Sequence, residues 1–270
     1  MKIAFLLVTC CLERSRSEIL AQVIGNLQKQ APEIQPVLDV FDNASTEEGT
    51  IDVLKDCFSN VYQADHNVGY WTAVDWWLQH LTVDPPAYTY VIESDMMHYD
   101  FNKIWTCADY LDVHPDVGAV RLHEYSIENY HLYNKDKPLP NSRRNLWQSH
   151  TNKVTGNDVQ LIEPTKGDVW ETTFLTQLPA LNRYETLRDV FAELGTLEGF
   201  IEPDFQRLYW QRFQKTGILD GGIYHCDLNT YGTKTITGSW TNPAELERLG
   251  YQATRAGRIM PRESYTVVKV

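Results

Sequence analysis

Tyr88-Thr-Tyr-Val-Ile-Glu93-Ser-Asp95-Met-Met-His98-Tyr99 is the stretch from which the fold of this 270-residue chain is predicted. Its first half is dense in β-branched and aromatic residues, which indicates a buried strand from Tyr88 to Glu93. Glu93 and Asp95 are one residue apart, so they project to the same side if strand geometry continues. Two acids at the end of a buried strand are costly unless a positive charge lies beside them. A divalent cation carrying a diphosphate is one solution, and acids that cap the next helix are the alternative.

Apolar strands and amphipathic helices alternate on both sides of this stretch. Further strands are expected at Ile3–Val8, Val37–Phe41, Val61–Tyr62 and Gly118–Leu122. Helices are expected at about 15–30, 51–57, 70–81 and 101–111, the first opened by a capping box of Ser15 and Glu18. Such alternation predicts an α/β fold with a Rossmann-like, mostly parallel sheet and helices on both faces.

Polar residues gather where these strands end. Thr9 follows the first strand, Asp42 and Asn43 follow the second, and Glu93 and Asp95 follow the fourth. Ligands of parallel α/β sheets bind beyond the carboxyl ends of the strands. We therefore expect the ligand site of this chain at that edge of the sheet.

The second half of the chain is less regular. Residues 124–158 are rich in Asn, Lys, Pro and Ser, which indicates a lid or an acceptor-contacting loop. A strand is expected at Trp170–Leu175 and another at Ile223–Cys226. Helices are expected at Tyr184–Leu194, ended by Gly195, and from a turn before Pro203 to about Gln214, ended by Gly217. We expect one compact domain with two halves, 1–123 and 124–270.

Composition excludes several classes of function. Lys and Arg number 24 against 36 Asp and Glu, a formal net charge of −12 without a long basic cluster. This disfavours binding to nucleic acid or to an anionic membrane through phosphates. The five cysteines are scattered without C-x-x-C spacing, which is typical of reduced thiols in a cytoplasmic protein. No apolar run approaches the roughly 20 residues that span a membrane, so we expect a soluble protein without stable membrane insertion.

In this order, the motifs resemble those of glycosyltransferases with the GT-A fold, most closely the family 2 type, over roughly residues 2–226. Val8-Thr9 with Arg14 resembles the first nucleotide-binding loop. Phe41-Asp42-Asn43-Ala-Ser45-Thr46 resembles the D-N-x-S segment, and Asn67-Val-Gly69-Tyr-Trp-Thr-Ala73 resembles the loop and helix that close over the nucleotide. Glu93-Ser94-Asp95 occupies the place of the D-x-D metal motif, with Glu in the first position.

The resemblance implies transfer of a sugar from a nucleotide-diphosphate donor, a UDP-sugar, to a hydroxyl acceptor of unknown identity. It implies Mn²⁺ or Mg²⁺ held by Asp95 and His225, with Glu93 and Ser94 on the donor side. It also implies that Glu202 or Asp204 acts as the catalytic base of an inverting enzyme, although Pro203 replaces one acidic position there.

Other interpretations stay open. A nucleotidyltransferase shares the sheet and the metal, but Thr9-Cys-Cys-Leu-Glu-Arg14 lacks its Gly-rich phosphate loop. A carbohydrate-binding module would explain 8 Trp and 15 Tyr but not the paired acids. A nucleic-acid acceptor fits the acidic charge less well. Turn formation is the structural alternative for Asp42, Asn43, Asn67 and Gly69, helix-end stabilisation for Glu202 and Asp204, and a structural imidazole for His225. We expect His98 at the surface or on the acceptor side, and Trp76 and Trp77 in packing.

Overall fold

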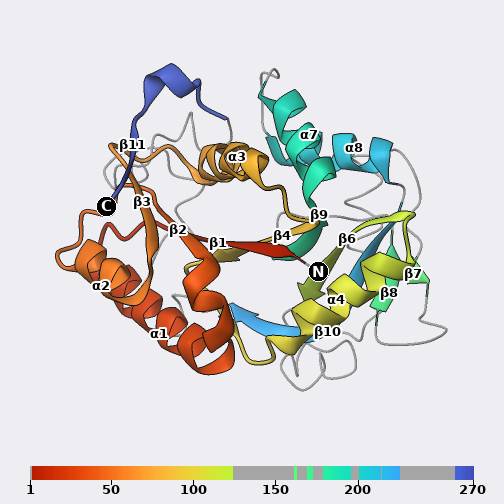
Figure 1. The fold of residues 1–270 in the computed structure, drawn as a ribbon, viewed down its shortest axis with the longest axis horizontal. Coiled ribbons are helices and arrows are strands. Elements are labelled where there is room, and N and C mark those ends of the chain that lie inside the picture. Colours follow the sequence, from red (N-terminus) through yellow and green to blue (C-terminus); the bar gives the residue numbers. More distant parts are fainter. Residues whose placement is uncertain are drawn as a thin grey trace, which may run out of the picture.

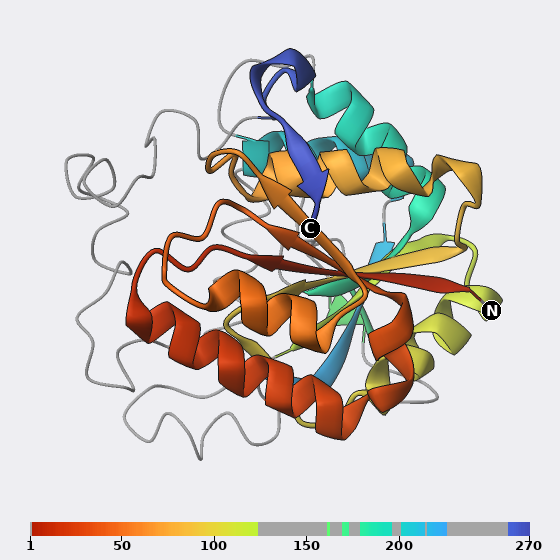
Figure 2. The ribbon, with the colours of Figure 1, turned by 60° about the vertical axis from the view of Figure 1, so that its left-hand side comes forward.

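The computed structural model describes residues 2–123, 161–162, 169–172, 179–195, 201–213, 215–225 and 259–270. Within these ranges the chain forms one mixed sheet with helices on both faces, as Figure 1 and Figure 2 show. The strands are β1 (Ile3–Thr9), β2 (Leu38–Asp42), β3 (Asn60–Ala64), β4 (Tyr88–Glu93), β5 (Met96–His98), β6 (Val117–His123), β7 (Leu161–Ile162), β8 (Val169–Thr172), β9 (Ala180–Arg183), β10 (Lys215–His225) and β11 (Val267–Lys269). The α-helices are α1 (Arg14–Gln30), α2 (Thr50–Cys57), α3 (Tyr70–His80), α4 (Asn102–Val113), α7 (Tyr184–Leu194) and α8 (Ile201–Arg212). Short 3₁₀ helices are η1 (Pro32–Val37), η2 (Leu81–Val83) and η4 (Arg262–Ser264).

The parallel half that the sequence predicts is confirmed. Neighbouring strands run in the order β3-β2-β1-β4, and each of these pairs is parallel. The apolar run of β1 is covered on both sides, since Phe5 and Leu7 enter one core while Leu6 and Val8 enter the other. This is the reason that β1 reads as a continuous apolar run instead of an alternating one.

Two helical layers enclose the sheet (Figure 2). The first core holds side chains of α1, α2 and α4, among them Leu27, Leu54 and Ile104. The second core holds side chains of α3, α7 and α8, among them Trp77, Phe191 and Leu208. Trp77 packs as expected, and its Nε1 donates a 2.8 Å hydrogen bond to Asp39 Oδ2.

The two halves of the chain share this sheet. Strand β9 lies antiparallel between β4 and β6, and β10 pairs in parallel with β6. The sheet is therefore mixed beyond β4. At the other edge, β11 pairs antiparallel with β3, which brings residues 267–269 back to the first half.

Two local expectations differ from the structure, and two others are confirmed. The capping box does not form: α1 begins at Arg14, its N-cap Glu13 makes no side-chain cap bond, and Glu18 pairs with Arg14. Gly195 and Pro203 mark the end of α7 and the first turn of α8 as expected.

Gly217 does not end α8, because that helix stops at Arg212 and Gly217 lies within β10. A Cβ atom on Gly217 would lie 2.8 Å from Val169 Cγ1 and 2.9 Å from Val120 Cγ2. Close packing of neighbouring strands explains this glycine.

Candidate functional site at the carboxyl ends of the parallel strands

The carboxyl ends of β1, β2 and β4 lie side by side. In the parallel registers, Thr9 pairs with Asp42, and Val8 pairs with Glu93. The sheet thus brings the three polar strand ends together as the sequence predicts. They meet where β1 is flanked by β2 on one side and β4 on the other, the place where open α/β sheets bind ligands.

Asp42 is fully buried at the end of β2 and is held by the protein itself. Its Oδ2 accepts hydrogen bonds from Ser45 N at 3.0 Å and from Gln63 Nε2 at 3.2 Å, and its Oδ1 accepts one from the Ser45 hydroxyl. Ser45 Oγ in turn accepts a 2.7 Å bond from Cys11 N. Burial raises the pKa of Asp42, and the bonds from Ser45 and Gln63 oppose that shift. This carboxylate therefore ties the loops after β1 and β2 together.

Two asparagines organise the loop after β3. Asn43 N donates to Thr9 O at 2.8 Å, and Asn43 Oδ1 accepts a 2.7 Å bond from Val68 N. Asn67 Oδ1 accepts a 2.9 Å bond from Gly69 N. Gly69 has a φ of 81°, which glycine adopts without steric cost, and it directly precedes α3. These turn-forming bonds place the start of α3 next to the other strand ends.

The acids at the end of β4 lie in a different environment from Asp42. Glu93, Ser94 and Asp95 are all half-buried. Burial, and then the charge of Asp95, raises the pKa of Glu93 to about 8. No side chain among the described residues donates a hydrogen bond to Glu93. The pKa of Tyr70, at the start of α3, is raised by burial and by the Glu93 charge, so this tyrosine lies beside the acids.

Such a donor set fits a divalent cation. Carboxylate oxygens are the ligands that Mg²⁺ and Mn²⁺ prefer, and these ions need few protein ligands because substrate and water oxygens complete their shells. The described residues contain no cluster of three or more His, Cys, Asp or Glu side chains suited to a metal.

An arginine that the sequence did not single out reaches these acids. Arg16 Nη1 donates a 3.2 Å hydrogen bond to Asp95 Oδ2, and both side chains are mostly buried, at 18% and 19% exposed. Arg14, the arginine expected at the nucleotide, is 84% exposed and pairs with Glu18 instead. The two lie two residues apart on α1, so they point to nearly opposite sides of the helix.

The expectation that His98 lies at the surface is wrong. It is fully buried at the end of β5, and its Nε2 lies 2.9 Å from the Tyr90 hydroxyl. Its backbone N–H donates to Asn26 Oδ1 at 2.8 Å. Burial lowers the pKa of His98 to about 3, so it is a neutral part of the core behind Asp95.

The expected residues of the second half are only partly described. Asp204 lies in the first turn of α8 and accepts bonds from Arg207 Nε and Nη2 at 3.2 and 3.1 Å. For Glu202 and His225 the backbone is placed, but the side chains lie outside the described part. The backbone of His225 pairs antiparallel with Met96, the residue after Asp95. The expected lid at 124–158 also lies outside the described residues.

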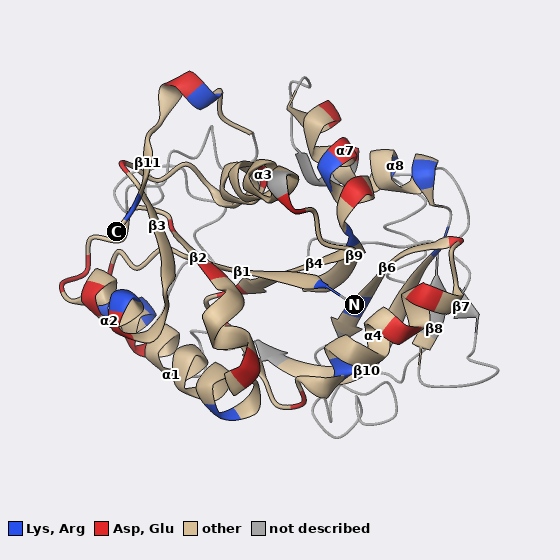
Figure 3. Ribbon diagram, viewed as in Figure 1, with Lys and Arg blue, Asp and Glu red and all other residues tan. Residues whose placement is uncertain are grey.

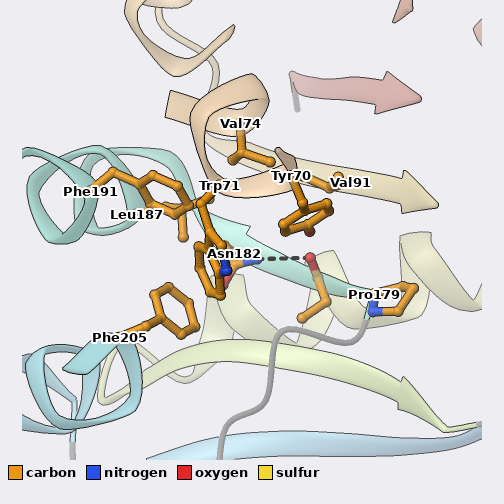
Figure 4. A pocket seen from close by; sticks show the side chains of 10 residues that line it. Tyr70, Trp71, Val74, Val91, Pro179, Asn182, Leu187, Phe191 and Phe205 are labelled. Carbon is orange, nitrogen blue, oxygen red and sulfur yellow. Dashed lines mark hydrogen bonds between the residues drawn. The ribbon is translucent and has the colours of Figure 1, made fainter. Parts of the chain in front are cut away.

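A small apolar cavity of about 30 Å³ connects the start of α3 with α8 (Figure 4). Tyr70, Trp71 and Phe205 line it, together with Asn182 from β9. The Trp71 and Phe205 ring centroids are 5.3 Å apart. The cavity is large enough for about one water molecule. It shows that α8 packs next to the helix that begins at the strand-end cluster.

The charge distribution agrees with the acidic composition. Figure 3 shows Lys and Arg scattered among Asp and Glu over the described helices, without a continuous basic face in that part of the chain. No helix among the described residues is long and apolar enough to cross a membrane.

The fold and the strand-end cluster define a GT-A fold, the nucleotide-sugar-binding architecture of many glycosyltransferases. The chain superposes on GalNAc-T7 with UDP, GalNAc and Mn²⁺ at a TM-score of 0.55 and 9% identity, over 83% of this chain and 44% of that one. It superposes on S. aureus TarS 1–349 at a TM-score of 0.51 and 12% identity, over 83% of this chain and 60% of that one. A mycobacterial protein gives a TM-score of 0.51 at 12% identity, over 93% and 75%.

At these low sequence identities, the comparison shows similarity of the fold alone. The chain spans about 60% of the length of TarS 1–349 and 44% of the GalNAc-T7 chain. Comparison of the sequence with protein-family models and with curated proteins found no match.

Proposed function

We propose that this chain is a metal-dependent glycosyltransferase that moves a sugar from a nucleotide-diphosphate donor, a UDP-sugar, to a hydroxyl acceptor. The observation that carries the proposal is the pair Glu93 and Asp95, half-buried and mutually repelling, at the carboxyl end of β4 in a GT-A fold. Structures of the same fold have been solved with UDP-GlcNAc, as for TarS, and with UDP and Mn²⁺, as for GalNAc-T7.

In this proposal residues 1–123 bind the nucleotide sugar, and residues 124–270 bind the acceptor. Thr9, Asn43, Asn67 and Gly69 shape the nucleotide side, which their loop-tying hydrogen bonds support. Asp42 contacts the base. Its carboxylate is buried and already accepts three bonds, so this contact requires a neighbour to move.

The metal, Mn²⁺ or Mg²⁺, would be held by Asp95 and His225, with Glu93 and Ser94 beside it. The backbone pairing of His225 with Met96 supports this pair of ligands. When bound, such a cation neutralises the charge that develops on the diphosphate leaving group. The protein contributes position: the pairing of β5 with β10 brings the two proposed ligand-bearing segments together from distant parts of the chain.

The base would be Glu202 or Asp204 in the first turn of α8. A carboxylate there removes the proton of the acceptor hydroxyl as that oxygen attacks the sugar. Asp204 is paired with Arg207, whose Nε and Nη2 both donate to Asp204 Oδ1. The aromatic contact of Phe205 with Trp71 ties this turn to α3 and so to the donor side.

Calorimetry with UDP and GDP, each with and without Mn²⁺, tests the proposal. We expect UDP binding that depends on Mn²⁺ and exceeds GDP binding. A screen for slow donor hydrolysis then identifies the sugar. Binding of a free glycan without any nucleotide binding would instead indicate a carbohydrate-binding module. For the base, loss of transfer with intact UDP binding is expected in Glu202→Gln or Asp204→Asn, and near-native transfer in both would refute the assignment.

A further inference from the structure

The cavity between α3, β9 and α8 combines an apolar wall with a buried hydrogen-bond acceptor (Figure 4). Trp71, Leu187 and Phe205 line it from three different helices. Asn182, on β9, also lines it and is 7% exposed. The Nδ2 atom of Asn182 donates a 2.8 Å hydrogen bond to Ala180 O, whereas its Oδ1 is buried and has no hydrogen-bond partner among the described residues. A buried acceptor without a donor is costly.

The neighbouring strand does not supply the missing donor. Thr89 lies opposite Asn182 in the antiparallel register of β4 and β9. Its hydroxyl is itself buried without a partner in the described part of the chain, and Thr89 does not line the cavity. A donor for Asn182 Oδ1 can therefore come from a group that enters the cavity.

The cavity lies beside the acids at the end of β4. Val91 lines it and is two residues before Glu93, so both side chains project from the same face of β4. Tyr70 lines it as well, and the charge of Glu93 contributes to the raised pKa of this tyrosine. From α8, Phe205 directly follows Asp204. The cavity thus lies between the proposed donor side and the proposed base, where the transferred sugar would lie.

The chemistry of the wall favours one kind of small group. A water molecule fits by size, but it needs about 2–4 polar partners, and most of the wall is apolar. A sugar hydroxyl brings two lone pairs as well as its donor, and an apolar wall does not satisfy them. A methyl group next to an amide N–H brings an apolar surface and a single donor. These two features match the wall and Asn182 Oδ1.

We propose that this cavity binds the acetamido group of the transferred sugar, so that the donor carries an N-acetylhexosamine and not a plain hexose. The methyl group packs between Trp71 and Phe205, and the amide N–H donates to Asn182 Oδ1. This inference rests on the proposed function and adds the class of sugar to it. A cavity that is only a packing defect would not distinguish an acetamido group from a hydroxyl.

The test compares matched donors by calorimetry at saturating Mn²⁺ without acceptor. UDP-N-acetylglucosamine is compared with UDP-glucose, and UDP-N-acetylgalactosamine with UDP-galactose. The two sugars of each pair differ only in an acetamido group in place of a hydroxyl. We expect the acetamido donor of at least one pair to bind about 10- to 100-fold more tightly, the scale on which an apolar pocket discriminates small groups. UDP alone serves as the reference for the nucleotide contacts.

Two variants locate the preference in the cavity. Val74→Ile adds a methyl group at the cavity wall, so the acetamido donor should lose most of its advantage over the hydroxyl donor. Asn182→Leu removes the acceptor and should reduce the advantage by about 10-fold. Val190→Ile is the matched control, because it makes the same exchange at a buried position of the same core that does not line the cavity. If Asn182→Leu does not fold, Val74→Ile beside Val190→Ile still decides.

Three results would overturn the inference. They are equal binding of both donors in each pair, tighter binding of the hydroxyl donors, and an acetamido preference that Val74→Ile leaves unchanged. All three leave Mn²⁺-dependent UDP binding intact and so spare the proposed function. A wild type that binds no UDP at all refutes the proposed function itself.

Discussion

Two buried parallel strands of this protein end in acids, and the two ends are built differently. At the end of β2, Asp42 is enclosed and accepts three hydrogen bonds from Ser45 and Gln63. At the end of β4, Glu93 and Asp95 stay half-buried, and burial, with the charge of Asp95 as the smaller cause, raises the pKa of Glu93 to about 8. The first acid is held by hydrogen bonds within the fold, whereas Glu93 accepts no hydrogen bond from a side chain of the described residues.

This difference separates a structural role from a binding role. A carboxylate that already accepts three hydrogen bonds from the chain stabilises the loops around it and keeps about one acceptor site for a ligand. A buried carboxylate whose pKa is raised, as that of Glu93 is, costs stability, and such groups are characteristic of functional sites. We therefore propose the metal site at the end of β4 and not at the end of β2.

The largest expected effect comes from Asp95. Asp95→Ala should reduce Mn²⁺-dependent UDP binding at least about 100-fold, because it removes the proposed metal ligand and leaves the guanidinium of Arg16 unpaired. Calorimetry at saturating Mn²⁺ measures it. Asp189→Ala, which removes the acid of an exposed Arg–Asp pair, is the matched control. If Asp95→Ala binds UDP with the affinity of the wild type, the binding role assigned to the end of β4 is wrong.

Glu93 should make the stability of the metal-free protein depend on pH. Its folded-state pKa is raised from the usual 4.5 to about 8. The contribution of neutral Glu93 to the free energy of unfolding is therefore fully present below about pH 4.5. It decreases by on the order of 1–3 kcal/mol as the pH rises to about 8. Urea unfolding of wild type and Glu93→Gln across this range measures the loss.

The glutamine variant should lack that pH dependence, and added Mn²⁺ should remove it from the wild type. Glu18→Gln, at an exposed acid, should behave like the wild type. Identical pH profiles for wild type and Glu93→Gln would show that the β4 acids are as well satisfied as Asp42.

Asp42 should act mainly through stability. Asp42→Ala leaves Ser45 N and Gln63 Nε2 without their acceptor, which should lower the free energy of unfolding by roughly 1–3 kcal/mol. Ser45→Ala, which keeps the carboxylate, should cost about 1 kcal/mol. Chemical unfolding of both variants checks this. A fully stable Asp42→Ala with much weaker UDP binding would reverse the roles assigned to the two strand ends.

The smallest effect is expected from Arg14. Its pair with Glu18 is exposed, so Arg14→Gln should change the free energy of unfolding by less than about 0.5 kcal/mol. Thermal unfolding measures this change. A clearly larger loss would mean that Arg14 makes contacts beyond its turn of α1, and the contrast with Arg16 would then need revision.

The sequence by itself determined most of the secondary structure of the first half and the clustering of the strand-end residues that form the candidate site. Strand β4 has the predicted limits, and α3 the predicted start at Tyr70, since apolar periodicity and turn residues are local signals. The clustering of strand-end residues also followed, because neighbouring parallel strands end at the same edge. The sequence could not show that β9 lies between β4 and β6. The pairing of a strand with a distant segment is not a local property of the sequence.

Only the tertiary structure decided which of these residues are used within the fold and which remain for a ligand. Asp42 and Asp95 look alike as acids after apolar strands, but their states depend on Ser45, Gln63 and Arg16, which lie 3 to 79 positions away. Arg14 and Arg16 likewise look equivalent until α1 is placed. A helix turns about 100° per residue, so two positions separate an arginine in solvent from one among the acids.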